Sequence, residues 1–224
     1  GAIVKKLKDE GIYENTLIVI ASDHGDYNGG KTTLYEGGTK IPLMMHWPNG
    51  IKPNQTYDEL VQNIDFAPTF LDLAGVNFKK SKNELNFDGV SLKNVLNGSK
   101  HPVHEYLFFE LGFARGVMTK NWKYIAVRYD QQTQRNIEKG IEFKGWKGVS
   151  LKYPYYVRNG HLGNSASQNN ELYFEPNQLF NLENDPYEKT NLFSVDSTKA
   201  KEMKNVLTQF LKSFKERPFG EFIN

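Results

Sequence analysis

Three polar side chains in one glycine-rich stretch have the types and spacing to do chemistry at a cleft: Asp23, His24 and Lys31. Asp23 and His24 directly follow TLIVIA, an apolar run typical of a buried strand, which can hold both side chains rigidly, as metal ligation requires. An aspartate at this position can equally cap a turn or a helix. Lys31 follows Gly29-Gly30 and could bring its ammonium over the same cleft as a point charge for an oxyanion, although a solvated loop lysine is the alternative.

A second pair of candidates is His101 and His104, spaced i and i+3, with Glu105 beside them. Histidines and carboxylates at this spacing can bind a metal. No neighbouring element supplies clear further partners, so a surface role is favoured.

The elements around Asp23, His24 and Lys31 predict an α/β arrangement, with a polar loop where open α/β sheets bind ligands, at the carboxyl edge of a strand. Within this loop, Tyr35-Glu36-Gly37-Gly38 places two glycines where the backbone needs positive φ or a very close approach. The hydrophobic pattern predicts helices over 2–10 and 65–74 and buried strands over 16–21 and 41–48.

Beyond residue 100 the pattern changes to short strand candidates separated by turns, which predicts an antiparallel sheet. A polar segment from about 131 to 170 is expected to contain few regular elements, and an apolar stripe predicts a final helix over 198–215 that packs on the sheet. The predicted domains are therefore 1–100 and 101–224. The strand candidates are EYLFFELG, RGVMT, NWKYIAVRY, ELYF and QLFNL.

Composition excludes several classes of function. The 28 basic and 26 acidic residues give a net charge of +2 and form no basic block, so nucleic acid is not expected as a partner. The chain has no cysteine, which excludes disulfides, thiolate zinc sites and a cysteine nucleophile within it. It has no apolar run of about 18 residues, and its first residues do not read as a signal peptide, so no membrane span is expected.

Several motifs in collinear order resemble those of the type I sulfatases, which belong to the alkaline phosphatase superfamily. The resemblance implies the C-terminal part of a mixed sheet sandwiched by helices, followed by a smaller subdomain with an antiparallel sheet and a C-terminal helix. The matching runs are SDHG, GKTTLYEGGTKIPL, WPNG, DFAPT, DGVSL, WKY and LFNLENDP.

This resemblance also implies roles for individual residues. Asp23 and His24 are expected to be ligands of a divalent cation, usually calcium, and Lys31 to contact the sulfate ester. Lys31 and the cation would then neutralise charge on the sulfate oxygens as the S–O bond breaks. Arg115 and His161 are expected substrate contacts, because the C-terminal subdomain of relatives rims the cleft.

The chain departs from the family pattern in two ways. Lys40 stands where the family usually has arginine, and lysine cannot make the planar bidentate contact. The C/S-x-P-x-R motif that yields the formylglycine nucleophile is absent, as are the paired aspartates that complete the metal site. We therefore expect a fragment that is inactive alone, whose partner is the missing N-terminal half of the same protein.

The leading hypothesis is a hydrolase of sulfuric esters that acts, when intact, on a sulfated carbohydrate or small molecule. One alternative is another hydrolase of the superfamily, specific for phosphate or phosphonate esters. The other is a non-catalytic module that binds sulfated glycans. The resemblance implies a periplasmic or extracellular location, or a lysosomal one in a eukaryote.

Overall fold

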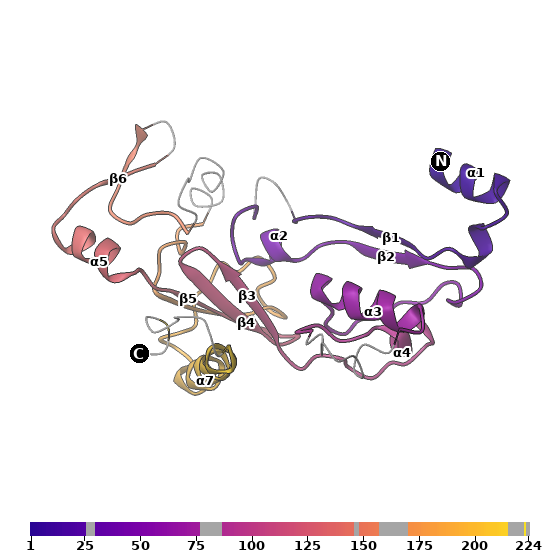
Figure 1. Ribbon diagram of the computed structural model, residues 1–224. Helices are drawn as coiled ribbons and strands as arrows, with labels where there is room; N and C mark the ends of the chain where they lie inside the picture. The colour runs from indigo at the N-terminus through magenta and orange to yellow at the C-terminus, as the bar shows by residue number, and fades with distance from the viewer. Residues whose placement is uncertain (26–29, 77–86, 146–147, 157–169, 215–221, 223–224) are drawn as a thin grey trace. The chain divides into compact units, whose positions relative to one another are not determined.

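The structure is a computed structural model that describes residues 1–25, 30–76, 87–145, 148–156, 170–214 and 222 of the chain (Figure 1). These residues form two compact units. The first comprises residues 1–21 and 42–107, and the second comprises residues 22–41 and 108–224. The glycine-rich loop, residues 22–40, therefore belongs to the same unit as the C-terminal sheet. The domain boundary expected at residue 100 stays a prediction.

The first unit contains a two-stranded antiparallel sheet and short helices. Its strands are β1 (Ile18–Ala21) and β2 (Leu43–His46), paired from Ile18 opposite His46 to Ala21 opposite Leu43. The predicted helices at the start of the chain and after residue 65 are confirmed as α1 and α3. The helical elements are α1 (Ala2–Asp9), η1 (Tyr13–Asn15), η2 (Asn63–Asp65), α3 (Phe66–Leu73) and α4 (Lys93–Leu96).

The expected burial of both faces of β1 and β2 is wrong for the described residues. Ile20 and Met44 are 56% and 57% exposed, although both are large and apolar. Among the described residues β1 and β2 pair only with each other, so no further strand extends this sheet. A continuous apolar run indicates a strand, but it does not say what covers that strand.

The second unit is built on a four-stranded sheet in the order β3-β4-β5-β8. The predicted antiparallel sheet is confirmed: β5 pairs antiparallel with β4 on one side and with β8 on the other. The strands are β3 (Leu107–Leu111), β4 (Ala114–Met118), β5 (Trp122–Val127) and β8 (Asn177–Asn181).

The two faces of this sheet carry different partners, as the alternation of side chains along β5 requires. Tyr124 and Ala126 belong to the core that includes α7 (Ser197–Ser213), the predicted final helix, whose Leu207 is buried there. Ile125 belongs to a second core, which it shares with Leu34 and Tyr35 of the glycine-rich loop. The sheet therefore separates the C-terminal helix from the loop that carries the candidate site residues.

The polar segment after β5 contains more regular structure than the sequence predicts. Helix α5 (Gln131–Glu138) begins at Asp130, whose side chain accepts a hydrogen bond from the backbone N–H of Thr133. A small hairpin follows, formed by β6 (Phe143–Lys144) and β7 (Ser150–Leu151).

The strand predicted over ELYF is wrong, because these residues form turns. Tyr173 of this segment stacks on Tyr156 at 4.0 Å between ring centroids, and its hydroxyl accepts a hydrogen bond from the Tyr156 backbone N–H. Aromatic packing rather than strand pairing therefore decides its conformation.

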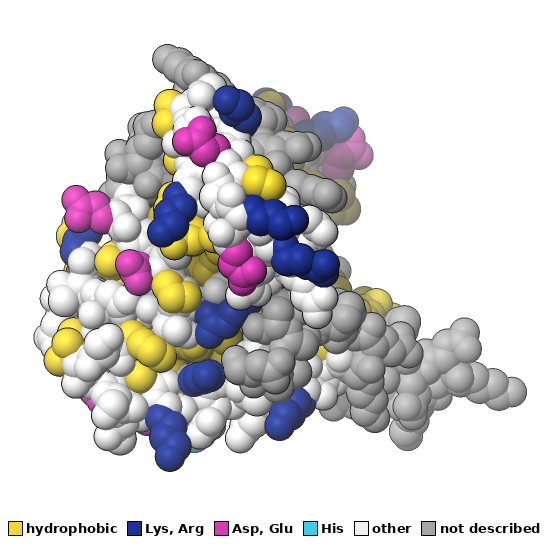
Figure 2. Space-filling model, turned by 90° about the vertical axis from the view of Figure 1, so that its left-hand side faces the viewer, with side chains coloured by type: hydrophobic (Ala, Val, Ile, Leu, Met, Phe, Trp, Pro, Cys, Tyr) yellow, Lys and Arg dark blue, Asp and Glu magenta, His cyan; other side chains and the backbone are white. Residues whose placement is uncertain are grey.

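The surface around α5 and the β6–β7 hairpin mixes charges of both signs. Figure 2 shows Lys and Arg side chains there interspersed with acidic and hydrophobic side chains. No helix in the described ranges has both the length and the apolar character that crossing a bilayer requires.

Candidate functional site

The second half of the glycine-rich loop, residues 30–40, packs on the sheet of the second unit. Leu34 and Tyr35 are each 3% exposed and lie in one core with Ile125 and Phe180. The Tyr35 hydroxyl donates a hydrogen bond of 2.7 Å to Gln178 Oε1. Burial raises the pKa of Tyr35 far above its ordinary value, so the phenol stays neutral and acts as an anchor.

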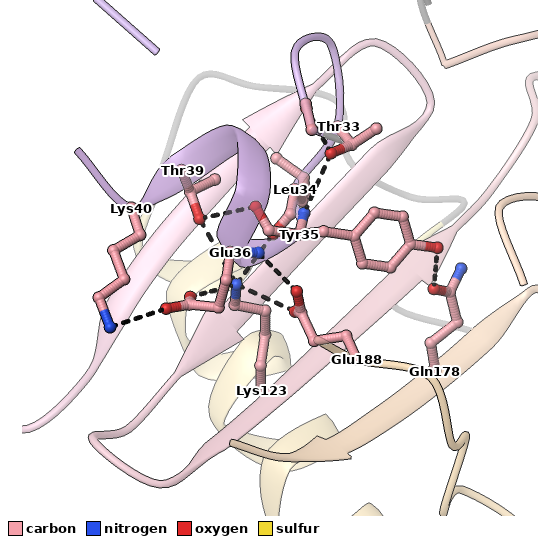
Figure 3. Close-up of polar contacts among 10 residues, drawn as sticks. Thr33, Leu34, Tyr35, Glu36, Thr39, Lys40, Lys123, Gln178 and Glu188 are labelled. Carbon is pink, nitrogen blue, oxygen red and sulfur yellow. Dashed lines mark hydrogen bonds and ion pairs between the residues drawn. The ribbon is translucent and has the colours of Figure 1, made fainter. Parts of the chain in front are cut away.

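A buried lysine from β5 holds the same loop through its ammonium group (Figure 3). The side chain of Lys123 is fully buried, and its Nζ lies 2.6 Å from Glu36 Oε1 and 3.1 Å from Glu188 Oε1. Nζ also donates to the Leu34 carbonyl at 3.1 Å and lies 3.4 Å from Thr39 Oγ1. One ammonium therefore connects β5 to three positions of the loop and to a carboxylate that follows β8.

Glu188 completes this cluster from a strained backbone conformation. Its φ is +54°, a value that is uncommon for residues other than glycine, and the residue is 1% exposed. Its Oε2 accepts a hydrogen bond of 2.5 Å from the Glu36 backbone N–H. Burial raises the pKa of the Glu188 carboxyl above its ordinary value of 4.5, and the Lys123 charge and the Glu36 N–H oppose that rise.

The glycines of the loop allow two backbone segments to approach closely. The sequence predicted either such an approach or a positive φ at Gly37-Gly38, and the structure shows the close approach. A Cβ on Gly30 would lie 1.8 Å from the carbonyl carbon of Gly37, and a Cβ on Gly25 would lie 2.2 Å from the Gly37 oxygen. A Cβ on Gly38 would lie 2.3 Å from the Gly30 oxygen. The Gly25 N–H also donates to the Gly38 carbonyl at 3.0 Å. Both arms of the loop therefore meet at Gly37-Gly38.

This closure brings the predicted metal ligands and the predicted sulfate contact onto one small piece of backbone. Asp23 and His24 immediately precede Gly25, and Lys31 immediately follows Gly30. Next to Lys31, Thr32 has a φ of +70°, and the N–H of the following residue, Thr33, bonds to the Gly30 carbonyl. The turn that presents Lys31 is therefore tight and defined.

The geometry of Asp23 and His24 suits two ligands of one cation. His24 Nδ1 lies 2.8 Å from the Gly25 carbonyl oxygen, which fixes a proton on Nδ1 and leaves the lone pair on Nε2. That Nε2 lies 3.7 Å from Asp23 Oδ1, and the Asp23 side chain is 84% exposed. Among the described residues no group of three or more His, Cys, Asp or Glu side chains could hold a metal ion. The pair can therefore supply one corner of a metal site.

Lys40 and Arg115 make contacts with acidic side chains. The side chain of Lys40 is 80% exposed and 4.0 Å from Glu36 Oε2. Arg115, in β4, donates to the carbonyls of Gly112 and Ala114 and lies 3.4 Å from Glu110 Oε2. His161 falls outside the described residues, and the substrate contacts expected of Arg115 and His161 stay predictions.

The surface role favoured for the two histidines near residue 100 is wrong for His104. Its Nε2 lies 3.0 Å from both carboxylate oxygens of Asp65, and its side chain is 9% exposed. Asp65 is fully buried and also accepts hydrogen bonds from the backbone N–H groups of Gln62 and Val90. His104 therefore helps to satisfy a buried carboxylate.

Comparison with known proteins identifies a family for the part of the chain that includes this loop. A sequence model of the sulfatase family matches residues 1–76, which include the whole glycine-rich loop. Over these residues the chain belongs to the sulfatase family.

The sulfatase relatives are much longer than the chain. It is 30% identical over 201 residues to an ulvan-active sulfatase of Formosa agariphila, a match that covers 85% of the chain and 36% of the relative. It is 42% identical over 105 residues to human N-acetylglucosamine-6-sulfatase, covering 44% of the chain and 18% of that enzyme. The chain thus spans about a third of the length of the first relative and a smaller part of the second.

Solved structures confirm the predicted fold class. A protein in complex with its substrate D-glucosamine-2-N,6-O-disulfate superposes with a TM-score of 0.65 at 23% identity, over 97% of the chain and 38% of that protein. A sulfatase from Pseudoalteromonas gives a TM-score of 0.65 at 21% identity, over 97% of the chain and 41% of that protein. At these identities the likeness establishes the fold alone.

Sequence reasoning missed the residues that hold the sulfatase loop in place. Lys123 falls within the Trp-Lys-Tyr run that resembles the family, and no motif in the sequence points to Glu188. A usable signal existed, because a lysine within an otherwise apolar strand needs a carboxylate partner if that strand is buried. The sequence could not say which of the 26 acidic residues supplies it.

Proposed function

We propose that the full-length protein containing this chain hydrolyses sulfate esters of carbohydrates, and that the glycine-rich loop provides part of its sulfate site. The observation that supports the proposal is the closure of both arms of the loop on Gly37-Gly38, because Gly25 follows Asp23 and His24 and Gly30 precedes Lys31. Relatives with carbohydrate substrates in their names support the choice of substrate class.

In this proposal the chain's own residues bind and orient the ester. The Lys31 ammonium faces the sulfate oxygens and offsets the negative charge that builds up on them and on the leaving oxygen. The turn at Thr32 fixes the position of Lys31 before substrate binds, so that no reorganisation is needed during the reaction.

A divalent cation, calcium in our proposal, is held in part by Asp23 and His24. Calcium prefers about six to eight oxygen ligands, so a carboxylate and an imidazole supply only part of its shell, and the remaining ligands belong to other parts of the full-length protein. When bound, the cation contributes positive charge beside the sulfate oxygens. On the family resemblance, we assign the nucleophile to a formylglycine, and we place it outside this sequence, which contains no C/S-x-P-x-R motif. On the family resemblance, we also propose a periplasmic, extracellular or lysosomal location.

The deciding experiment compares ester hydrolysis by the full-length protein on matched aryl substrates. We expect turnover of the aryl sulfate to exceed that of the aryl phosphate and phosphonate, with a sulfated monosaccharide also hydrolysed. A preference for phosphate would identify another hydrolase of the superfamily. Binding of a sulfated glycan without any hydrolysis would identify a binding module.

A further inference from the structure

We propose that Lys123 and Glu188, which lie outside the glycine-rich loop, are positioning residues for sulfate ester hydrolysis: together they fix residues 30–40 on the sheet and so set the location of Lys31. This inference rests on the proposed function and deepens it. It assigns a role in the reaction to the C-terminal sheet.

The contacts of Lys123 point to the loop. Its ammonium contacts Leu34, Glu36 and Thr39 from the loop and Glu188 from the segment after β8. Glu188 in turn accepts the backbone N–H of Glu36, the first residue of α2 (Glu36–Thr39). The pair therefore holds both a side chain and the backbone of the loop, and Figure 3 shows these contacts converging.

The cluster of Lys123, Glu36 and Glu188 costs the folded state free energy that an apolar contact would not cost. A fully buried lysine loses its hydration, and well-packed apolar side chains often stabilise a protein as well as a buried ion pair does. Glu188 also adopts a positive φ, which is strained for a residue with a Cβ. Strain of this kind persists where the surrounding structure determines the geometry, and such sites cluster where function requires it.

A short path joins the cluster to Lys31. The Leu34 carbonyl is fixed by Lys123, and the preceding residue, Thr33, donates to the Gly30 carbonyl through its N–H and through its hydroxyl at 2.6 Å. Lys31 lies within that turn. A shift of the loop on the sheet would therefore move Lys31 directly, and a misplacement of about 1 Å can cost about a hundredfold in rate.

The test uses three variants of the full-length protein. Lys123→Met removes the ammonium but keeps an unbranched side chain, and Glu188→Gln removes the negative charge at constant size. Leu207→Ala is the control. Leu207 is buried on the opposite face of the sheet, so its substitution lowers stability without changing a contact of the loop. For each variant we measure kcat and KM on an aryl sulfate well below the melting temperature, together with amide hydrogen exchange.

We expect Lys123→Met to lower kcat/KM by about a hundredfold, mainly through kcat, and Glu188→Gln by about tenfold. Leu207→Ala keeps its kcat although its melting temperature falls. The amides of Gly38, Thr39 and Lys40, which bond within the loop, exchange faster in Lys123→Met, whereas those of β5 do not. An equal loss of kcat in Lys123→Met and Leu207→Ala would reduce the role to stability and overturn the inference.

The exchange measurement separates this inference from the proposed function. A wild-type protein that hydrolyses no sulfate ester refutes the proposed function, and with it the positioning role in that reaction. Loop amides that exchange at the wild-type rate in Lys123→Met show that the cluster does not hold the loop, and they overturn the inference even if the wild type is an active sulfatase.

Discussion

The three charged groups of the cluster differ in how far water reaches them. The Lys123 side chain is fully buried and that of Glu188 is 2% exposed, whereas that of Glu36 is 15% exposed. Solvent therefore stabilises the Glu36 charge more than the Glu188 charge, which depends on Lys123 and on a backbone N–H. Burial raises the pKa of the Glu188 carboxyl, so its ionised form costs the folded state free energy.

This asymmetry predicts how stability depends on pH. Because the pKa of Glu188 is raised in the folded chain, the folded state binds more protons than the unfolded state above about pH 4.5. Its contribution to stability is fully present below the unfolded pKa and is lost as the pH rises through the folded pKa. We expect the unfolding free energy of wild type minus that of Glu188→Gln to fall as the pH rises from about 4 to 7.

Urea unfolding of both proteins at several pH values measures this difference. The Gln side chain cannot titrate, so it removes the contribution while keeping the size of the side chain. A difference that stays constant, or that rises with pH, would contradict the raised pKa.

Lys31 allows a direct prediction for activity. Lys31→Ala in the full-length protein should lower kcat/KM on an aryl sulfate by about a hundredfold to a thousandfold, because it removes a positioned charge from the developing anion. Lys201→Ala, on the exposed face of α7, is the matched control and should be neutral. Steady-state kinetics check the prediction, and an unchanged rate in Lys31→Ala would remove Lys31 from the sulfate site.

At the scale of elements, the loop is defined by backbone contacts that only glycine permits. Gly38→Ala would place a Cβ 2.3 Å from the Gly30 oxygen and 2.6 Å from the Thr33 oxygen, so one arm of the loop must move. We expect a loss of about 1–3 kcal/mol in the free energy of unfolding, together with loss of sulfate ester hydrolysis.

Gly140→Ala provides the control for this loop prediction. Gly140 has a φ of +68° after α5 and nothing within 4 Å of an added Cβ, so its substitution adds backbone strain without a clash. It should cost about 1 kcal/mol and leave activity intact. Thermal melts and rates of both variants decide the matter, and equal activity in the two would show that the close approach is dispensable.

Sequence patterns predicted the helices and strands better than they predicted which residues pack against them. The stripe of Met203, Leu207 and Leu211 identified α7 because a helix buries residues at a spacing of three to four, and all three are buried. Period and turn signals likewise located β4, β5 and β8. They could not show that Tyr173 lies in a turn, because an aromatic residue favours both strand pairing and ring stacking.

At the scale of the whole molecule, the site draws on residues far apart in the sequence. The fold class and the loop followed from local motifs and from collinear resemblance. The contact between residue 123 and residues 34–39 depends on which sheet face the loop covers, and no local pattern encodes that. Asp23 and His24 present the same difficulty, since the cation role that we propose for them requires further ligands, and no group of three or more candidate ligands lies among the described residues.

Metal binding provides the prediction at this scale. Asp23 is 84% exposed and has one imidazole beside it, so this chain alone should bind calcium weakly, whereas the full-length protein should bind it tightly. Chelation should abolish hydrolysis of an aryl sulfate by the full-length protein, and added calcium should restore it. Asp23→Asn should weaken calcium binding about tenfold or more by calorimetry, because calcium affinity follows the charge of its ligands.

The control is Asp58→Asn, an exposed carboxylate of the first unit, which should leave calcium affinity unchanged. Tight binding by this chain alone would mean that the ligand set lies within it, contrary to the geometry of Asp23 and His24. Full activity after chelation would instead remove the cation from the reaction and leave Lys31 as the chain's main source of positive charge at the sulfate. Calorimetry on both proteins distinguishes these outcomes, because it measures binding without relying on turnover.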